Sequence, residues 1–392
     1  MKTMRLLSEH TVLPGERWVY SAGCNAGPAL TDTGRIDTEL DDLRRLAAAG
    51  ARVALLSHQG SAKDGTARHL EYLADYLGKR LGQKVRYFPE CATDPARRRA
   101  AELRDGDIVL FGNVRLDARE EDGDRELAAA LARLGDRVAI GGFSKAHRRH
   151  ASNVGILGFL PGYAAASLVR ETELLRPWRA GSGAAAGSVA VLGGVKPEKT
   201  TVGLESLTRT YDLVIPGGAV LNTILAVIGY AVGDSELGAD PERCAAVTRA
   251  VLARSNRARI HLPRTVVIAG PAGATRAVPV ENGVPDGWAV VDFHLEQWAV
   301  DAVRQAGRVL VAGTPGRHTE GNHRAAAAVL GARAPGDPAT LLLGGDTVAE
   351  LPWAGPRSTG GGSALHYLAD GTCAVIEALD GNRHKESSEH AA

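Results

Sequence analysis

Short apolar runs recur along this 392-residue chain, and helical patterns separate them. Fully apolar runs of this length fit strands that are buried on both faces, as parallel strands are when helices cover the sheet. The alternation therefore predicts an α/β fold built on parallel sheets. The expected strands lie at 52–58, 107–115, 137–143, 188–196, 211–218, 264–270, 308–316 and 340–346, and the clearest helices at 69–82, 124–135 and 164–175.

Eight such strands in a chain of this length suit two doubly wound, Rossmann-like parallel-sheet domains better than one. The stretch RPWRAGSGAAAGS (176–188) is rich in Gly, Ala and Ser and follows an expected helix, so it predicts a boundary. We expect four parts, which are an N-terminal domain, a connecting helix and hinge, a C-terminal domain, and a C-terminal segment that ends as a flexible tail. Their ranges are 1–165, 166–187, 188–372 and 373–392.

The composition excludes several classes of protein. Apolar residues make up 44% and charged residues 23% of the chain, as in ordinary globular proteins. The net charge is +1, so the overall charge does not favour nucleic-acid binding, and any anion site has to come from a local group of cations. The four cysteines form no CxxC or CxxxC pair, which argues against a zinc site or a disulfide framework. No run approaches the roughly 18 apolar residues of a membrane span, and no signal peptide precedes the first strand, so a cytoplasmic protein is expected.

The two halves of the chain differ in the residues that come directly after their strands. In the first half the strands are followed by His58, by Arg115 and by the basic cluster SKAHRRHAS (144–152). In the second half they are followed by glycines, in GG (193–194), PGG (216–218), GTPG (313–316) and GGD (344–346). Ligands of open α/β sheets bind beyond the carboxyl ends of the strands. The first half is therefore predicted to bind a small anion, and the second half to let its backbone approach a nucleotide.

Single motifs in the second half allow two interpretations each. The glycines of RSTGGGSALHYL (357–368) form either a phosphate site at a helix N-terminus or a flexible loop. Asp346 is either a helix N-cap or a magnesium ligand beside phosphates. Lys196 and Lys199 suit a transferring phosphoryl group, but loop lysines are commonly just solvated.

Taken in order, these motifs resemble the phosphoglycerate kinase family over about residues 18–372. LLSHQGS resembles LLSHLGRP, GNVRLDAREE resembles ENLRFHPGEE, and GGFSKAHRRHAS resembles DAFGTAHRAHAS. VLGGVK, VIPGGAVLNTIL and VENGVPDGWAVVD resemble ILGGAK, IIGGGMANTFL and VDEIPDGWMGLD, while GGDTVAEL and STGGGSAL match the C-terminal signatures. The resemblance implies a two-domain kinase that moves a phosphoryl group between ATP and a carboxylate through an acyl phosphate. It also implies that 1–165 is the acid-substrate domain, that 188–372 is the nucleotide-binding domain, and that the segment 373–392 returns to the N-terminal domain before its flexible tail.

The resemblance also implies roles for individual residues. Arg35 and Lys196 correspond to catalytic residues, and the cofactors are ATP or ADP with Mg²⁺, the metal being held by Asp346. The partners implied are a small anionic carboxylic acid, the nucleotide and a downstream reductase or acyl-transfer enzyme, with no nucleic acid and no membrane. The expected acid-binding residues are Asn25, His58, Arg115, Lys145, His147 and Arg148. The expected nucleotide-binding residues are Gly194, Lys199, Gly217, Gly218, Gly313, Glu320, Asp346, Thr347, Gly360, Gly361 and Gly362.

On the acid side this chain departs from the family pattern. Gly23 stands where the family has an aspartate that holds the substrate hydroxyl, and Ser61 stands where it has an arginine that grips the phosphate. A further aspartate of the family pattern is Gly141 here. Two cations are gained, because Lys145 replaces a threonine and Arg149 replaces an alanine.

The nucleotide side has changed less. Ala312 replaces an asparagine, and both Lys199 and Glu320 match the family only after a shift of one residue. The catalytic pair, Arg35 and Lys196, is retained.

Retained catalytic residues beside altered specificity residues favour an ATP-dependent carboxylate kinase acting on an acid other than 3-phosphoglycerate. One alternative is a true phosphoglycerate kinase with a remodelled pocket, in which Lys145 or Arg149 replaces the lost arginine. Another is a pseudokinase that binds a nucleotide or a partner without turnover. Either kinase would need hinge closure near 164–188 to bring its reactants together.

Overall fold

The computed structural model describes residues 4–31, 33–179 and 187–389. The chain divides into two compact units, a first unit of residues 1–173 and 372–392 and a second unit of residues 174–371. The division falls within helix α6 (Ala166–Leu175), inside the range expected for the connector. Residues 180–186 of that connector lie outside the described residues.

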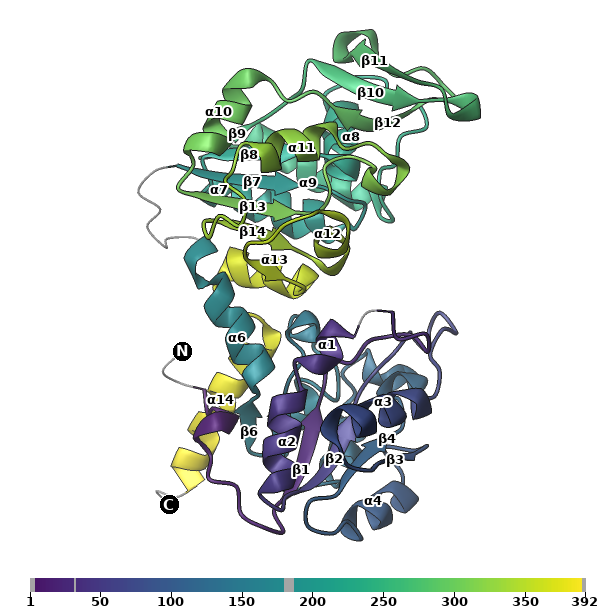
Figure 1. The fold of residues 1–392 in the computed structure, drawn as a ribbon, viewed down its shortest axis with the longest axis vertical. Coiled ribbons are helices and arrows are strands. Elements are labelled where there is room, and N and C mark those ends of the chain that lie inside the picture. Colours follow the sequence, from purple (N-terminus) through teal and green to yellow (C-terminus); the bar gives the residue numbers. More distant parts are fainter. Residues whose placement is uncertain (1–3, 32, 180–186, 390–392) are drawn as a thin grey trace. The chain divides into compact units, whose positions relative to one another are not determined.

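The first unit is built on one parallel six-stranded sheet with the order β3-β4-β2-β1-β5-β6 (Figure 1). Val19 of the central strand lies beside Ala54 on one side and Val138 on the other. The strands are β1 (Arg17–Ser21), β2 (Arg52–Leu56), β3 (Val85–Phe88), β4 (Ile108–Phe111), β5 (Arg137–Ile140) and β6 (Gly162–Ala164). The helices are α1 (Gly34–Asp37), α2 (Leu40–Ala48), α3 (Glu71–Leu81), α4 (Asp94–Ala101), α5 (Arg125–Ala132) and α14 (Ala374–Glu389).

Helix patterning explains how this sheet is covered. In α2 the residues Leu40, Leu43 and Leu46 recur at helical spacing and are buried, which places one apolar face of the helix against the sheet. Helix α3 ends at Gly82, whose φ of +69° is the left-handed conformation that suits a helix C-terminus. Every residue of β4 is buried, so both faces of the sheet are covered there.

The second unit holds a parallel six-stranded sheet with the order β15-β14-β13-β7-β8-β9 and a separate antiparallel sheet with the order β11-β10-β12. The parallel strands are β7 (Ser188–Leu192), β8 (Leu213–Pro216), β9 (Arg259–Ile260), β13 (Arg308–Ala312), β14 (Thr340–Leu343) and β15 (Arg357–Ser358). The antiparallel strands are β10 (Thr265–Ala269), β11 (Thr275–Pro279) and β12 (Ala289–Phe293). The helices are α7 (Glu205–Thr210), α8 (Gly218–Val227), α9 (Pro241–Ala253), α10 (Gln297–Gln305), α11 (Arg324–Gly331), α12 (Gly345–Glu350) and α13 (Gly361–Asp370).

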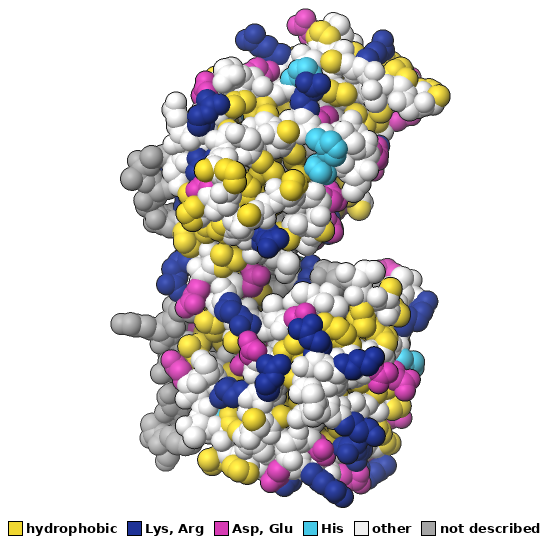
Figure 2. Space-filling model, in the orientation of Figure 1, with side chains coloured by type: hydrophobic (Ala, Val, Ile, Leu, Met, Phe, Trp, Pro, Cys, Tyr) yellow, Lys and Arg dark blue, Asp and Glu magenta, His cyan; other side chains and the backbone are white. Residues whose placement is uncertain are grey.

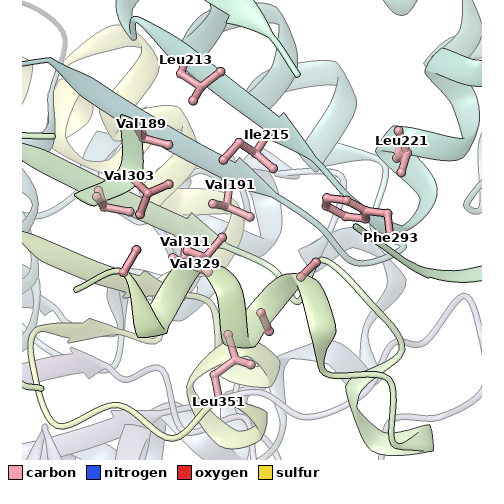
Figure 3. Close-up of a cluster of buried hydrophobic side chains, with 14 of the residues drawn as sticks. Val189, Val191, Leu213, Ile215, Leu221, Phe293, Val303, Val311, Val329 and Leu351 are labelled. Carbon is pink, nitrogen blue, oxygen red and sulfur yellow. The ribbon is translucent and has the colours of Figure 1, made fainter. Parts of the chain in front are cut away.

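One apolar core joins the two sheets of the second unit (Figure 3). Val189 and Val191 of β7 alternate onto the same face, as residues two apart in a strand must. They belong to the same buried cluster as Ile215 of β8, Val329 of α11 and Phe293 of β12. The antiparallel sheet is therefore part of this unit and not an independent domain.

The expected fold class, two parallel-sheet α/β units, is confirmed, and all eight expected strands are present. The stretch 264–270 differs in its pairing, because β10 lies in the antiparallel sheet. Its buried and half-buried residues alternate, and the short turn at Pro271–Gly273 returns the chain to pair with β11. An antiparallel sheet can leave one face exposed to solvent, whereas a parallel sheet is normally covered on both faces. The apolar composition of this stretch does not show which kind of sheet it joins.

The C-terminal segment also differs from its expected form. The segment was expected to return to the N-terminal domain and then to end as a flexible tail. It belongs to the first unit, and its helix α14 packs against β6 and continues to Glu389. Asn382 fixes this contact, since its side chain accepts a hydrogen bond from Gly162 N at 2.8 Å and donates to Leu157 O at 2.6 Å.

The surface carries both signs of charge. Figure 2 shows Lys and Arg side chains interspersed with Asp and Glu on the visible face of each unit. Many form pairs, such as Arg52 with Asp105 and Lys63 with Asp122. Across the described parts of the chain, no helix has the length and apolar character that crossing a membrane would require.

Replacing Ile215 by Ala is expected to lower the free energy of unfolding of the second unit by about 2–5 kcal/mol, because it opens a cavity in a fully buried site. Ile228→Ala is the matched control, since that side chain is 41% exposed and its truncation leaves no cavity. Urea unfolding followed by circular dichroism measures both variants. Equal losses of stability in the two would contradict the assigned core.

Candidate functional site

Three loops of the second unit touch one another through their backbones. A Cβ added to Gly193 would lie 2.1 Å from Thr314 O, one on Gly313 would lie 2.0 Å from Gly193 O, and one on Gly217 would lie 2.5 Å from the Cα of Pro315. Only glycine, which has no Cβ, fits at these three positions. We call this arrangement the glycine cradle, and it comprises 193–194, 217–218 and 313–315, at the carboxyl ends of β7, β8 and β13.

Helices begin beside the cradle without side-chain caps. The N-cap residues of α8, α12 and α13 are Gly217, Gly344 and Gly360, and no side chain accepts a hydrogen bond from the first turn of these helices. By contrast, Asp240 caps α9 through the backbone N–H of Arg243. Uncapped N–H groups at helix N-termini suit phosphate oxygens. At the start of α8 the N–H groups of Gly217 and Gly218 already donate to Leu192 O and Pro315 O, so of the expected glycines those at 361–362 are better placed for a nucleotide phosphate chain.

Lys196 and Asp346 form an exposed ion pair, with Nζ 2.7 Å from Oδ2. Asp346 is the second residue of α12, so the N-cap interpretation is wrong and the cap is Gly344. Thr347, the next residue, is buried. Lys199 begins a π-helical segment and is buried nearby; burial first, and then the charge of Lys196, lowers the pKa of Lys199 to about 8. Two lysines and one carboxylate thus gather at the edge where β7 and β14 end.

The donor set fits magnesium only in company with phosphates. Among the described residues no three His, Cys, Asp or Glu side chains gather closely enough to hold a metal alone. Asp346 offers a single, largely exposed carboxylate. Magnesium is commonly held by one or two carboxylates together with the phosphates of a substrate, so Asp346 could hold such an ion when a nucleotide is bound.

The remaining nucleotide candidates lie on the loop that follows β13. Ala312 is fully buried and has no polar side chain to offer. Glu320 is exposed and lies 3.5 Å from Arg317, in the short helical turn His318–Glu320. Gly313 begins this loop, and Glu320 lies near the far end of the loop. The loop is joined to the antiparallel sheet by a hydrogen bond from Arg317 N to Val291 O of β12.

In the first unit the expected anion-binding residues follow the carboxyl ends of β4, β2 and β5, at one edge of the sheet, with β1 between β2 and β5. His58 and Arg115 are both buried, at 7% exposure. Arg115 donates from Nη1 to Gly60 O at 2.8 Å, and its Nε is 3.8 Å from Glu121 and makes no hydrogen bond. Arg115 thus faces the counter-charges of Glu121 and Glu120, whereas Arg148 has no carboxylate partner among the described residues, so this pair of guanidinium groups can accept a further anion.

The two flanking histidines are hydrogen-bonding groups and not cations, which corrects the expectation of a wholly cationic cluster. Burial, followed by the nearby charges of Arg115, Lys145 and Arg148, holds the pKa of His58 well below its usual value. Burial and the same two arginines lower the pKa of His150 to about 4. Both imidazoles are therefore neutral at pH 7. The positive charge of the site comes from the arginines.

The two cations gained by this chain do not face a ligand. Arg149 is exposed and pairs with Glu377 of α14 at 3.0 Å, so it does not replace the missing phosphate-binding arginine. Lys145 is buried, and its ammonium donates to Ser21 Oγ at 2.6 Å and Asn153 Oδ1 at 2.8 Å.

Other expected residues of the acid side lie close to this edge in the chain. His147, in the same segment as Arg148, is partly buried. Asn25 is exposed in the loop after β1, and Arg35 follows it on α1.

Packing explains the two missing aspartates. A Cβ on Gly23 would lie 2.5 Å from the Cα of Gly142, and a Cβ on Gly141 would lie 2.3 Å from Oε2 of Glu39. Neither position admits a side chain without movement of its neighbours. At the third altered position, Ser61 donates a hydrogen bond to Glu121 at 2.7 Å.

Sequence reasoning missed three residues of this region, which are Glu39, Glu121 and Asn153. None was singled out as a candidate, and no pattern in the sequence marks any of them as part of a site. Only their contacts in the folded structure show that these three residues belong to this region.

Replacing Lys199 by Met is expected to stabilise the protein at pH 7 by about 1–3 kcal/mol. Because burial lowers the folded-state pKa of this amine to about 8 from an ordinary 10.5, the cost of its charge is fully present below pH 8. Stability of the unchanged protein should then rise between pH 8 and 10.5, and the advantage of the variant should disappear. Urea unfolding at pH 7, 9 and 10.5 measures this. Lys196→Met, at an exposed site, is the control and should change stability by less than about 0.5 kcal/mol.

The family model described as Phosphoglycerate kinase matches residues 23–382. The phosphoglycerate kinase of Pelotomaculum thermopropionicum is 34% identical to this chain, over 89% of this chain and 92% of the relative. That of Methylobacterium radiotolerans is 33% identical, over 97% of this chain and 99% of the relative.

Solved structures support the same fold. Phosphoglycerate kinase from Coxiella burnetii matches with a TM-score of 0.74 and 24% identity, covering 97% of this chain and 100% of the other. The enzyme from Pyrococcus horikoshii OT3 matches with a TM-score of 0.78 and 21% identity, covering 98% of this chain and 100% of the other. With a full-length family match and relatives above 30% identity, the chain belongs to the phosphoglycerate kinase family and is a kinase whose phosphoryl acceptor is a carboxyl group.

Proposed function

We propose that this chain transfers a phosphoryl group between Mg²⁺-ATP and 3-phosphoglycerate. The observation that carries the proposal is the pair of incompletely neutralised arginines, Arg115 and Arg148, beside neutral imidazoles at the carboxyl edge of the first sheet. The proposal departs from the leading sequence hypothesis, a different acid, because the relatives that match nearly the whole chain are named phosphoglycerate kinases.

The two arginines suit the phosphate of the acid. The two guanidinium groups repel each other. Burial lowers the pKa of Arg115, and the charge of Arg148 lowers it further. A bound dianion would remove that repulsion and fill the unmade hydrogen bond of Arg115 Nε. The neutral histidine at position 58 can donate one further hydrogen bond without adding charge. Arg35, on α1, is assigned to the reacting carboxylate by its correspondence to the family motif.

The second unit supplies the nucleotide side of the proposal. The glycine cradle and the uncapped helix starts would receive the nucleotide and its phosphates. Lys196 would neutralise charge on the transferring phosphoryl group, which is the main catalytic need of such a reaction. Magnesium bound with the nucleotide would neutralise further phosphate charge, and Asp346 would hold it. Since Asp346 pairs with Lys196 at 2.7 Å, nucleotide binding would separate that pair and free the lysine.

Transfer requires the two bound reactants to meet with water excluded. We therefore include a closure step around the connector at 166–187 in the proposed cycle. The product would be an acyl phosphate, which a reductase or an acyl-transfer enzyme could consume.

A second candidate, kinase activity on another small anionic acid, is favoured by Gly23 and Ser61. The position of Gly23 admits no carboxylate to hold a substrate hydroxyl. Ser61 is engaged with Glu121 and supplies no positive charge to a phosphate. An acid with a different anionic group or without the hydroxyl would suit such a pocket.

A coupled assay with ATP and 3-phosphoglycerate is expected to show turnover, and Lys196→Met is expected to lower kcat about 100-fold or more, because it removes charge stabilisation of the transferring group. Lys63→Met, at an exposed lysine of the first unit, is the matched control and should keep full activity.

The alternatives give different results. No turnover of 3-phosphoglycerate, together with acyl phosphate formed from another acid and trapped by hydroxylamine, would establish the second candidate. Thermal stabilisation by Mg²⁺-ATP without turnover of any acid would indicate a pseudokinase.

Gly313→Ala is expected to weaken Mg²⁺-ADP binding about tenfold or more, measured by calorimetry. The added Cβ would meet Gly193 O at 2.0 Å, and a φ of +106° strains any side chain. Gly331→Ala is the control, because a Cβ there meets nothing within 4 Å. If Gly313→Ala binds Mg²⁺-ADP as tightly as the unchanged protein, the cradle does not contact the nucleotide.

A further inference from the structure

A buried lysine connects strand β1 to the loop that carries Arg148. Lys145 is 5% exposed, and its ammonium donates to Ser21 Oγ at 2.6 Å and to Asn153 Oδ1 at 2.8 Å. Ser21 ends β1, and Asn153 lies at the far end of the loop. The lysine therefore links two segments that are distant in sequence, and its charged end is directed into the protein.

Asn153 passes this link on to the backbone of Arg148. Its Nδ2 donates to the carbonyl oxygens of Lys145 at 2.8 Å and of Arg148 at 3.1 Å. Both amide donors and the amide oxygen are thus engaged, and the residue is 1% exposed. Because one bond goes to the carbonyl of Arg148 itself, it fixes the point from which that guanidinium extends.

Two glycines leave room for the lysine. A Cβ on Gly142 would lie 2.4 Å from the Cα of Gly23 and 3.1 Å from Cε of Lys145. The φ of Gly142, +72°, is also one that side chains rarely adopt. Gly142 thus lies between the backbone at Gly23 and the stem of the lysine, and a side chain at position 142 would crowd both.

Charges from several segments face the ammonium. Burial lowers the pKa of Lys145 to about 8, and Arg115 acts in the same direction, whereas Glu120 and Glu39 favour the charged form. Both carboxyl groups are themselves buried. A buried cation persists only with such compensation, and here it comes from nearby carboxyl groups together with the hydrogen bonds to Ser21 and Asn153.

We infer that Lys145 is a positioning residue of the acid site, which acts through Asn153 to hold the backbone of Arg148 and does not touch the acid. The inference rests on the proposed function, in which Arg148 binds the phosphate of the acid. It also assigns a role to a residue for which the family pattern has a threonine.

The test is a double-mutant cycle of Lys145→Met and Arg148→Ala, with the Kd of 3-phosphoglycerate measured by calorimetry without nucleotide. Each single variant should bind about tenfold more weakly. The double variant should bind no more weakly than Arg148→Ala, because a positioning residue has no effect once the positioned group is gone. If the loss of affinity in the double variant is the product of the two single losses, Lys145 contacts the acid itself. If Lys145→Met binds the acid as tightly as the unchanged protein, Lys145 has no role in acid binding. Either result overturns the inference.

Asn153→Ala keeps the test decisive if Lys145→Met does not fold. That variant keeps the lysine charge but loses the bonds to the loop, so positioning predicts about tenfold weaker binding, whereas a direct charge effect predicts little change. The KM for ATP should stay unchanged in both variants, since the nucleotide candidates lie in the second unit, and Lys63→Met should change neither constant.

Failure of the proposed acid would be distinguishable from failure of this inference. If the unchanged protein does not bind 3-phosphoglycerate, the cycle is run with inorganic sulfate. Sulfate binding should depend on Arg148, and Lys145→Met should weaken it only when Arg148 is present. That result would uphold the positioning role of Lys145 and would overturn 3-phosphoglycerate as the substrate. Sulfate binding that does not depend on Arg148 would overturn the positioning role as well.

Discussion

Parallel pairing sends the carboxyl ends of all strands in a sheet to one edge, and the chemistry of this protein depends on that constraint. In the first unit it gathers His58, Arg115 and Arg148, which are up to 90 residues apart in the chain. In the second unit the same constraint gathers glycines, because there the loops touch through their backbones. One architectural rule thus yields a basic edge in one unit and a bare-backbone edge in the other.

The two units manage positive charge differently. In the first, Arg115 is buried with one unmade hydrogen bond, and the imidazole of His58 stays neutral under the influence of the arginines. In the second, Lys196 is exposed and paired with Asp346. The basic edge of the first unit would therefore receive an anion without separating a hydrogen-bonded ion pair, whereas a ligand at the edge of the second unit would have to separate one.

Much of this organisation can be predicted from the sequence, because strand periodicity and the residues after each strand are local properties. The fold class and the edge at which each candidate lies could be predicted in this way. The orientation of Lys145 and Arg149 could not, since it depends on partners at Ser21 and Glu377, 124 and 228 residues away. The neutrality of His150 likewise depends on burial and on charges brought near by folding.

The contact between Gly23 and Gly142 has a consequence for engineering. An acidic group cannot be grafted at position 23 alone, because the loop after β5 already occupies the space that its first carbon needs. Separating the loops would in turn displace the lysine stem beneath Gly142. A redesign of position 23 therefore has to include Gly142, and through it Lys145, whose stem lies beside that glycine.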